Sequence, residues 1–396
     1  MHPLDITGVG VVTPLGVGID AFVAGLREGR DGFTTSPDTF DAKPYEGACV
    51  GEVRGFEPGK YLGDKGLRTL DRLTKLLLVA TRLAAVDAGI KKDGQYLSLS
   101  PRRVGLCAST AYGSLEAITE LDRVAVLEDA RYLNPAKFPN TVINSAAGYA
   151  SIWEDLRALN VTVSNGNTGP LDAILCAGMY LGAGAADAIL VGGAEALSEA
   201  LYLAFRRLGV LREQHGGANG IRLGEGAALF ALQPPEVAAV RGARRVARIV
   251  GYGTSFEPPE SEVLMVHPSS VAIGQAIRAA LDDAGWDASS VDLVVSSASG
   301  LPDFDRAERT SIDAVIGTEV PIAAPKLVLG ESLGAASALG LASGLAWIGA
   351  LSDGGPIPLG PASLRGETRA EAERVICTAV GFYGTAAAVA FTRGTS

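Results

Sequence analysis

One short turn of the chain has the residue types and spacing of a nucleophile site. The stretch Val161 to Gly178, VTVSNGNTGPLDAILCAG, runs from a β-branched strand through an Asn/Gly turn into an apolar helix. A side chain in the first turn of a buried helix lies near unpaired backbone N–H groups and the positive end of the helix dipole, which lower the pKa of a thiol and stabilise developing negative charge. The residue in this position is Asn167, and a neutral amide cannot act as a nucleophile or carry a covalent intermediate.

Two loops later in the chain hold further candidate residues. Ser297 lies in VDLVVSSASGLPDFDRAE, directly after a predicted strand, and Lys326 and Glu331 lie in PKLVLGESLGAASA, ahead of an apolar helix. We expect Glu331 to cap that helix and Asn167 to form and cap its own turn. The three histidines, His2, His215 and His267, lie at none of these positions.

These stretches resemble the motifs of β-ketoacyl synthases, the thiolase-fold condensing enzymes of fatty-acid and polyketide synthesis. The family's nucleophile turn reads roughly TVSTACSSGLDAI, and Thr162 to Ser164 and Leu171 to Ile174 match it. The opening ITGVGVVTPLG and the late VGFYGTAAA also resemble family motifs, so the resemblance covers essentially the whole chain. It places the position of the catalytic cysteine at Asn167 and the positions of the two catalytic histidines at Ser297 and Glu331.

All three catalytic positions are therefore replaced, while the surrounding motifs survive. A carboxylate at Glu331 would repel both the carboxylate of a malonyl extender and an enolate oxygen, which is electrostatically wrong for condensation. Of the family's two pantetheine-binding hydroxyls, Ser299 keeps one and Leu301 replaces the other. The sequence predicts a relative of condensing enzymes that cannot condense.

The branch that fits best is the chain length factor, the non-catalytic subunit that pairs with a cysteine-bearing ketosynthase in type II polyketide synthases. The resemblance implies two partners, that ketosynthase and an acyl carrier protein with a phosphopantetheine-bound acyl chain. An aromatic and a reducing, polyene-type pathway both stay open. Two other functions stay open as well: a repurposed acyltransferase or cyclase that uses Glu331, His267 or Ser297 without a covalent intermediate, and a homodimeric scaffold for carrier proteins.

In the family, the strand before the nucleophile turn pairs across the two-fold axis of a dimer. An unpaired strand edge exposes backbone N–H and C=O groups, and a partner subunit can pair with them. The predicted dimer strand comprises Val161, Thr162, Val163 and Ser164. The resemblance also places a turn and its following loop at the interface, near the partner's acyl tunnel. The residues of this turn and loop that are candidates for closing that tunnel are Tyr112, Leu115, Glu116, Thr119 and Phe138. The alternative is that Tyr112 and Leu115 only pack the interface.

The resemblance implies an α/β, thiolase-like fold with duplicated α-β-α-β-α layers and two central buried helices. Two halves of similar element order, predicted as residues 1–235 and 245–396, indicate an internal duplication. The two small-residue helices, which open near Asn167 and Glu331, would pack at the centre as pseudo-symmetry mates. Residues 333–351 carry no charge, but their Ala, Gly and Ser content favours a central helix over a membrane span.

Hydrophobic periodicity predicts the elements that must position these motifs. An amphipathic pattern predicts a helix over residues 67–88, and a second helix is predicted over residues 115–127. Runs rich in apolar residues predict strands over residues 103–109, 160–164 and 188–193. The alternation of strands and helices is typical of an α/β fold.

The composition excludes several other classes of function. A chain of 396 residues with 47% hydrophobic and 20% charged residues indicates a well-packed globular protein, and its net charge of −10 argues against a nucleic-acid surface. The four cysteines show no CxxC spacing, so we expect no metal site and no disulfide framework, and no motif indicates a cofactor. The opening MHPLDITGVG lacks a basic segment followed by an apolar one, so we expect no signal peptide. We therefore expect a cytoplasmic protein that does not bind membranes.

Overall fold

The computed structural model describes residues 2–217, 219–261, 266–352, 355–368 and 370–394. Its main strands form two sets of five. The first set comprises β1 (Leu4–Thr13), β7 (Val104–Ser109), β8 (Asn160–Val163), β9 (Ala188–Glu195) and β10 (Gly226–Gln233). The second set comprises β11 (Ala247–Phe256), β12 (Leu293–Val295), β13 (Ile322–Ala323), β15 (Arg374–Val380) and β16 (Thr385–Arg393).

The two sets have the same topology. The spatial order is β8-β7-β9-β10-β1 in the first set and β13-β12-β15-β16-β11 in the second. In each set the first three strands are parallel and the last two pair antiparallel to their neighbours. The short strand β14 (Ser363–Arg365) continues the second set beyond β13, whereas β8 ends the first set with its outer edge unpaired among the described residues. Residues 4–6 of β1 pair with residues 247–249 of β11 and join the two sets.

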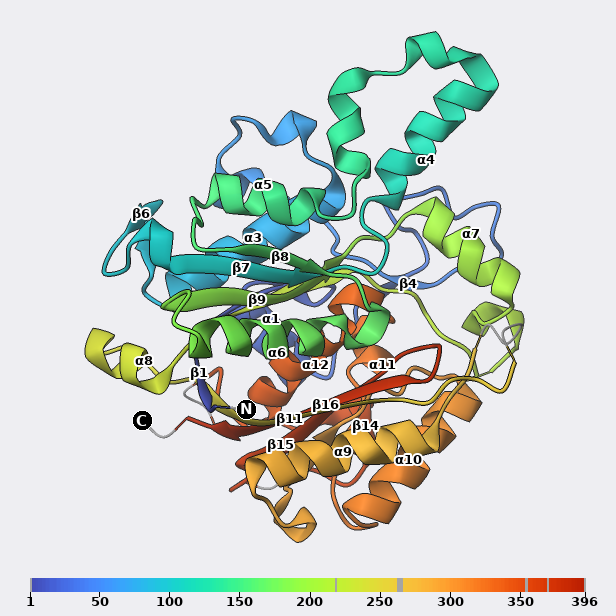
Figure 1. Ribbon diagram of the computed structural model, residues 1–396. Coiled ribbons are helices and arrows are strands. Elements are labelled where there is room, and N and C mark those ends of the chain that lie inside the picture. Colours follow the sequence, from blue (N-terminus) through green and yellow to red (C-terminus); the bar gives the residue numbers. More distant parts are fainter. Residues whose placement is uncertain (1, 218, 262–265, 353–354, 369, 395–396) are drawn as a thin grey trace.

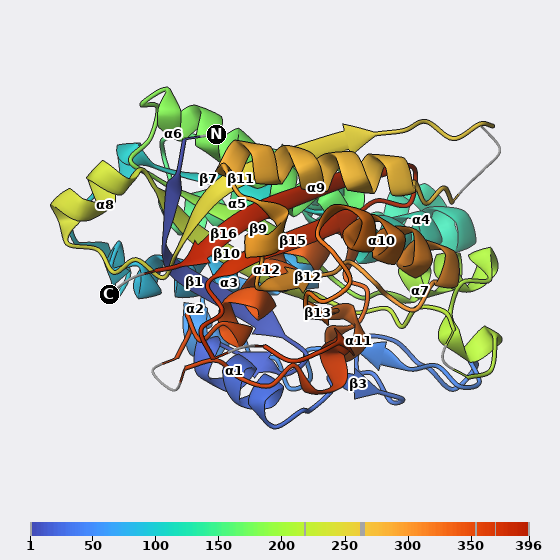
Figure 2. The same cartoon turned by 90° about the horizontal axis from the view of Figure 1, so that it is seen from below.

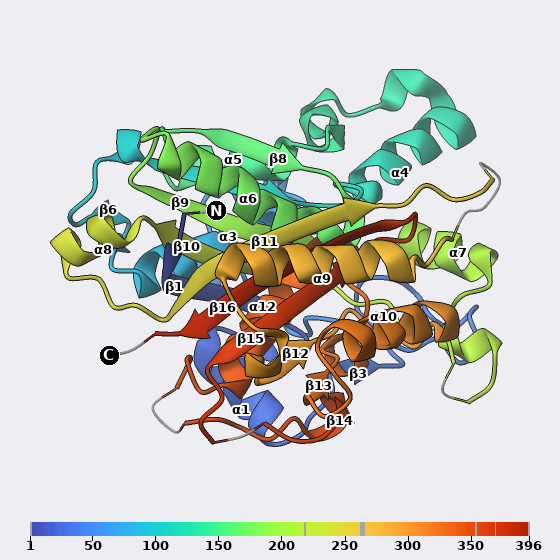
Figure 3. The same ribbon diagram turned by 60° about the horizontal axis from the view of Figure 1, so that its bottom comes forward.

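Helices fill equivalent places in both sets. The first connection carries α3 (Arg72–Asp87) and α9 (Ser270–Ala284), the second carries α5 (Ser145–Trp153) and α10 (Pro302–Val315), and the third carries α6 (Gly169–Gly182) and α12 (Ala336–Trp347). Figure 1 shows α3 and α5 outside the first set and α6 and α12 between the two sets. Figures 2 and 3 show α9 and α10 covering the second set. These five layers confirm the predicted thiolase-like α/β fold, whereas the division into domains 1–235 and 245–396 stays a prediction.

The central helix α12 is buried on all sides, from Ala336 to Trp347. Its small residues allow this close packing, because a Cβ atom added at Gly344 would lie 2.9 Å from both the Phe391 ring and the Val295 side chain. The interpretation of this charge-free stretch as a core helix is therefore confirmed. Within the described part of the chain, no helix is both long enough and apolar enough to span a bilayer.

The remaining elements surround these layers. They are α1 (Ile19–Arg27), α2 (Gly59–Leu62), α4 (Leu115–Val124), α7 (Glu199–Leu208), α8 (Pro235–Arg241), α11 (Lys326–Leu329), and the short strands β2 (Gly16–Val17), β3 (Phe33–Thr34), β4 (Val50–Gly51), β5 (Lys91–Lys92) and β6 (Gln95–Tyr96). The segment from α4 to residue 141 extends away from the body of the molecule (Figure 1).

Two predicted helices differ from the structure at one end. The helix predicted from residue 67 begins at Arg72, because the Asp71 side chain accepts a hydrogen bond from Thr74 N at 2.7 Å and caps it there, and residues 67–69 form a separate 3₁₀ turn. The helix predicted over residues 115–127 ends at Val124 and continues as a π-helical turn over residues 125–129.

Candidate functional site

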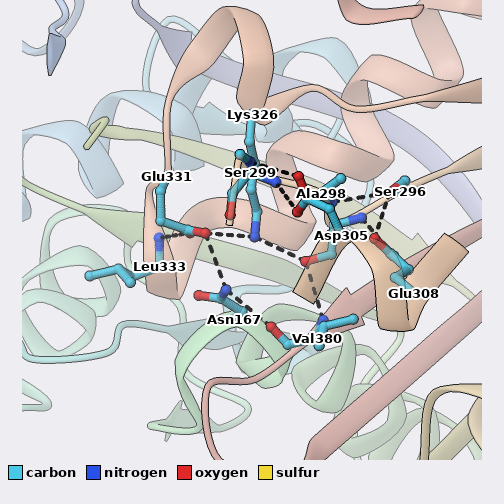
Figure 4. Close-up of polar contacts among 12 residues, drawn as sticks. Asn167, Ser296, Ala298, Ser299, Asp305, Glu308, Lys326, Glu331, Leu333 and Val380 are labelled. Atoms are coloured by element: carbon cyan, nitrogen blue, oxygen red, sulfur yellow. Dashed lines mark hydrogen bonds and ion pairs between the residues drawn. The ribbon is translucent and has the colours of Figure 1, made fainter. Parts of the chain in front are cut away.

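The site forms where the two halves of the fold meet. The turn before α6, the loop between β12 and α10, the turn before α12 and the end of β15 converge there (Figure 4). These segments bring Asn167, Ser297 and Glu331 together, as the resemblance implies. Lys326, at the start of α11, reaches into the same place.

A buried polar network connects these residues. Lys326 Nζ donates to Glu331 Oε2 at 2.7 Å and to Ser297 Oγ at 2.9 Å. Asn167 Nδ2 donates to Glu331 Oε2 at 3.3 Å and to the Val380 carbonyl at 3.2 Å. Ser297 Oγ also accepts a bond from Val380 N at 3.2 Å. With Glu331 only 1% exposed, the ammonium of Lys326 supplies the charge partner that a buried carboxylate requires.

The structure does not bear out the capping predictions for Glu331 and Asn167. Glu331 Oε1 accepts a hydrogen bond from Leu333 N at 2.9 Å, at the start of a 3₁₀ turn, but α12 begins at Ala336 without a side-chain cap, so Glu331 fixes the turn before the helix and does not cap the helix itself. The prediction that Asn167 caps its own turn is wrong. Its amide instead donates to Glu331 and Val380, because the buried carboxylate and carbonyl need hydrogen-bond donors, and no described residue donates to Asn167 Oδ1.

Two carboxyl groups of α10 belong to the site and were missed from the sequence. Glu308 accepts hydrogen bonds from Ser297 N at 2.8 Å and from Ser296 Oγ at 2.6 Å, and burial raises the pKa of Glu308. Asp305 accepts bonds from Ser299 N at 3.0 Å and from the next backbone N–H, and burial raises the pKa of Asp305 as well. The i, i+3 spacing of these acids, directly after the Ser297 loop, was the available signal. They fix the loop that holds Ser297.

The side chains leave almost no free space in the site. The cavity lined by Asn167, Ser297, Lys326, Glu331 and Phe382 has a volume of about 10 Å³, which is room for about one water molecule. An acyl chain or a pantetheine arm does not fit in this arrangement. Ser299 lines the same small cavity, but Leu301 and His267 do not.

His267, which the alternative acyltransferase or cyclase function would use, does not line this cavity. Its backbone N–H donates to the Phe382 carbonyl at 2.8 Å, and His267 pairs with Tyr383 in an isolated β-bridge outside the cavity. This contact depends on how two distant segments meet, which local sequence does not reveal. Of the acid–base candidates of the sequence, only Glu331 and Ser297 lie in the site.

The candidates for closing a partner's tunnel lie at and after the end of β7. Tyr112 is 46% exposed, and Phe138 is 66% exposed on the projecting segment. Leu115 is half-buried against the chain's own core cluster around Leu333, and the exposed Thr119 donates from its hydroxyl to the Leu115 carbonyl at 2.8 Å. Glu116 lines a second, larger cavity behind α4. The five residues therefore face different surroundings.

The predicted dimer strand is the edge strand of the first set. Val161, Thr162 and Val163 in β8 are half-buried, and the exposed Ser164 donates from its hydroxyl to the Ala111 carbonyl at 3.1 Å. The helices α5 and α6 flank β8 and expose Ile152, Met179 and Tyr180. An unpaired edge and exposed apolar side chains thus lie on one side of the molecule.

Comparisons with known proteins agree with this architecture. Residues 1–238 match the family description "Beta-ketoacyl synthase, N-terminal domain", and residues 246–349 match "Beta-ketoacyl synthase, C-terminal domain". The chain belongs to the β-ketoacyl synthase family. Asn167, Ser297 and Glu331 lie together in a chain of this family, and the equation of their positions with the family's cysteine and two histidines stays a prediction.

Several relatives of this β-ketoacyl synthase-like chain are named as 3-oxoacyl or ketoacyl synthases. It is 28% identical over 352 residues to 3-oxoacyl-(acyl-carrier-protein) synthase 2 of Vibrio cholerae, covering 84% of this chain and 83% of the relative. It is 30% identical to the tetracenomycin polyketide synthase ketoacyl synthase alpha subunit of Streptomyces glaucescens, covering 85% of this chain and 83% of that subunit. The solved structure of the ishigamide ketosynthase/chain length factor is similar over the full length of both chains, with a TM-score of 0.84 and 26% identity.

Proposed function

We propose that this chain is a non-catalytic, chain length factor-like subunit of a type II polyketide synthase. The observation that carries the proposal is the network of Lys326, Glu331 and Asn167, which fills the site and leaves about 10 Å³. The position that needs a nucleophile holds an amide, so no acyl group can be carried there. The chain would act by pairing with a ketosynthase that supplies the cysteine.

Electrostatics also support a non-catalytic site. Condensation develops negative charge on an enolate oxygen, and enzymes stabilise such charge with preorganised donors or cations. Here the cation, Lys326, already binds the Glu331 carboxylate at 2.7 Å. The resemblance assigns the position of that carboxylate to the second histidine. A malonyl carboxylate entering this site would meet a like charge.

Pairing with another subunit is supported by the surface around β8. A strand edge without a neighbour exposes backbone hydrogen-bonding groups, and exposed apolar patches mark interaction sites. Exposed apolar residues near this edge, and on the projecting segment that precedes β8 in the chain (Figure 1), are Tyr112, Val126, Leu127, Tyr132, Phe138, Val142, Ile143, Ile152 and Met179. A ketosynthase covering this surface would place its own acyl tunnel against Tyr112 and α4, while an acyl carrier protein delivers the chain to the ketosynthase.

The proposal is tested by co-expression with the ketosynthase encoded nearest to this chain. We expect a stable heterodimer by size exclusion with mass analysis, and acylation of the partner's cysteine only, by intact-protein mass spectrometry after addition of acyl and malonyl carrier protein. A stable acyl adduct on this chain, or decarboxylation of malonyl carrier protein by this chain alone, would contradict the proposal.

The same experiment distinguishes the alternatives of the sequence analysis. A homodimeric scaffold would form a dimer without the ketosynthase and keep it in the partner's presence. An acyltransferase or cyclase would turn over acyl thioesters on its own. That activity would have to use Glu331 or Ser297, both of which already bind the Lys326 ammonium.

A further inference from the structure

A third cavity lies beside α8, on the side of the molecule away from α4 and α7 (Figure 1). Its volume is about 1010 Å³, at the upper end of the range for small-molecule pockets. Its walls include one face of α8, residues within 243–248 at the start of β11, residues 349–352 after α12, and the end of β16. It shares no lining residue with the cavity around Asn167.

The lining of this cavity has a surplus of positive charge. Its ionisable side chains among the described residues are Arg244, Arg245, Arg248, Arg393, Asp5 and Asp20. Four arginines against two aspartates leave the lining with a net charge of +2, in a chain whose net charge is −10. All of these arginines except the exposed Arg244 are half-buried. A concave surface of one charge raises the local concentration of ions of the opposite charge.

The arginines of the lining differ in their partners. Arg248 donates to Asp5 from Nε at 2.7 Å and from Nη2 at 3.2 Å, so it neutralises the buried Asp5 carboxylate. Arg244 lies 3.2 Å from Asp87, in a partly exposed ion pair that contributes little. No described side chain binds the half-buried Arg393 guanidinium. Because charges that leave water are normally paired, these five N–H donors indicate that an anion from outside the chain completes the cavity.

The arrangement of the arginines favours a phosphate over a carboxylate. Guanidinium groups bind both anions through paired N–H donors. A carboxylate offers two oxygens in one plane, whereas a phosphate offers three or more oxygens in tetrahedral directions. The phosphate therefore suits cations that come from separate segments, with Arg245 ahead of β11 and Arg393 at the end of β16. The exposed Asp20, in the first turn of α1, disfavours anions of low charge and leaves the lining positive.

Most of the remaining lining is apolar. It comprises Pro235, Ala238 and Ala239 of α8, together with Val246, Ala350 and Leu351. Apolar side chains near a cluster of cations are typical of pockets that hold the uncharged part of a ligand beside its charged group. Inorganic phosphate alone would leave this wall without a contact.

We infer that this cavity binds a small organic phosphate, whose phosphate oxygens accept hydrogen bonds from Arg393 and Arg245 and whose uncharged part packs against the apolar wall. The inference goes beyond the proposed function and does not depend on it, because the cavity and the Asn167 site have no lining residue in common. Loss of one charge-assisted hydrogen bond weakens binding by roughly tenfold to 100-fold.

Isothermal titration calorimetry of the purified chain, in buffer free of phosphate and Mg²⁺, tests the inference with four probes. They are ADP, inorganic pyrophosphate, adenosine, and citrate, which carries a similar negative charge on carboxylates alone. We expect ADP to bind at least about tenfold more tightly than adenosine and citrate. It should bind at least about threefold more tightly than pyrophosphate, because the apolar wall contacts its organic part.

Two variants locate the site. Arg393→Met and Arg245→Met keep most of the side-chain length and should each weaken ADP binding about tenfold. The matched control is Arg207→Met at an exposed position of α7 that does not line the cavity, and it should leave ADP binding unchanged. Arg248 is unsuitable for this test, because its loss would leave the buried Asp5 carboxylate unpaired.

Equal affinity for ADP and adenosine, or unchanged ADP binding by both cavity variants, would overturn the inference. Citrate binding as tight as that of ADP would refute the preference for phosphate, and pyrophosphate binding as tight as that of ADP would refute the role of the apolar wall. If Arg245→Met fails to fold, Arg393→Met alone decides. Pairing with a ketosynthase and acylation of this chain are measured separately, so the proposed function can fail while ADP still binds.

Discussion

Glu195 gives the sharpest test of the electrostatics beside the site. It ends β9, is 1% exposed, and accepts hydrogen bonds from Ala111 N at 2.6 Å, Gly334 N at 3.2 Å and Thr110 Oγ1 at 3.2 Å. It thus ties the turn before Tyr112 to the turn before α12. No described Lys or Arg pairs with it, so burial raises the pKa of Glu195 from 4.5 to about 7 in spite of these donors.

The sign and size of the pH effect follow from this pKa. Because the pKa is raised in the folded state, the contribution of Glu195 to stability is fully present below pH 4.5 and is lost as the pH rises through 7. Each pH unit in this window changes the free energy of unfolding by up to about 1.4 kcal/mol, so the whole window costs about 3 kcal/mol. Glu195→Gln removes the charge and keeps the contacts, since its Oε1 can accept the two backbone bonds and its Nε2 can donate to Thr110 Oγ1.

Thermal unfolding between pH 4.5 and 8 measures the effect. For 396 residues at about 2 cal/mol/K each, 3 kcal/mol corresponds to about 4 °C. The Tm of the wild type should therefore fall relative to Glu195→Gln by about 4 °C between pH 4.5 and 8. The control is Glu128→Gln at an exposed position, and its difference in Tm from the wild type should stay the same between pH 4.5 and 8. Parallel curves for the wild type and Glu195→Gln would refute the reasoning.

Three further predictions concern the site and the interface. Lys326→Met should lower the free energy of unfolding, measured in urea, by about 4 kcal/mol, because it leaves the Glu331 carboxylate buried and unpaired. Adding Glu331→Leu to this variant should restore most of the lost free energy of unfolding. Asn167→Cys should neither accept an acyl group nor restore condensation by mass spectrometry and product assay, since Ser297 and Glu331 remain. Tyr112→Ala in the ketosynthase complex should lengthen the product with the complex intact on size exclusion; loss of association with unchanged product length would show that Tyr112 only packs the interface.

The resemblance to a known family implied the layers, and local patterns predicted the elements that build them. The charge-free, small-residue stretch over residues 333–351 predicted a central helix, and the short β-branched run of β8 predicted a strand before the turn that holds Asn167. Helix ends were less predictable, since the start of α3 depends on a single cap at Asp71 within a longer amphipathic pattern.

The chemistry of the site was only partly predictable, because it depends on contacts between distant segments. Asn167 contacts Glu331 and Val380, which lie in the other half of the chain, and its local sequence indicated only a turn former. A glutamate on a polar helix predicts an exposed side chain, but the fold buries Glu308 against the Ser297 loop. The closure of the cavity to about 10 Å³ follows from packing that no single motif encodes.

The polar residues of the site depend on one another for hydrogen bonds and charge balance. Asn167 donates to Glu331, Lys326 neutralises Glu331, and Ser297 accepts from Lys326. A cysteine at position 167 would remove the amide donor from the buried carboxylate. A histidine at position 331 would leave the Lys326 ammonium without its counter-charge. Each single change therefore breaks contacts made by the other residues, so we expect the effects of these changes on stability to be non-additive in double-mutant cycles.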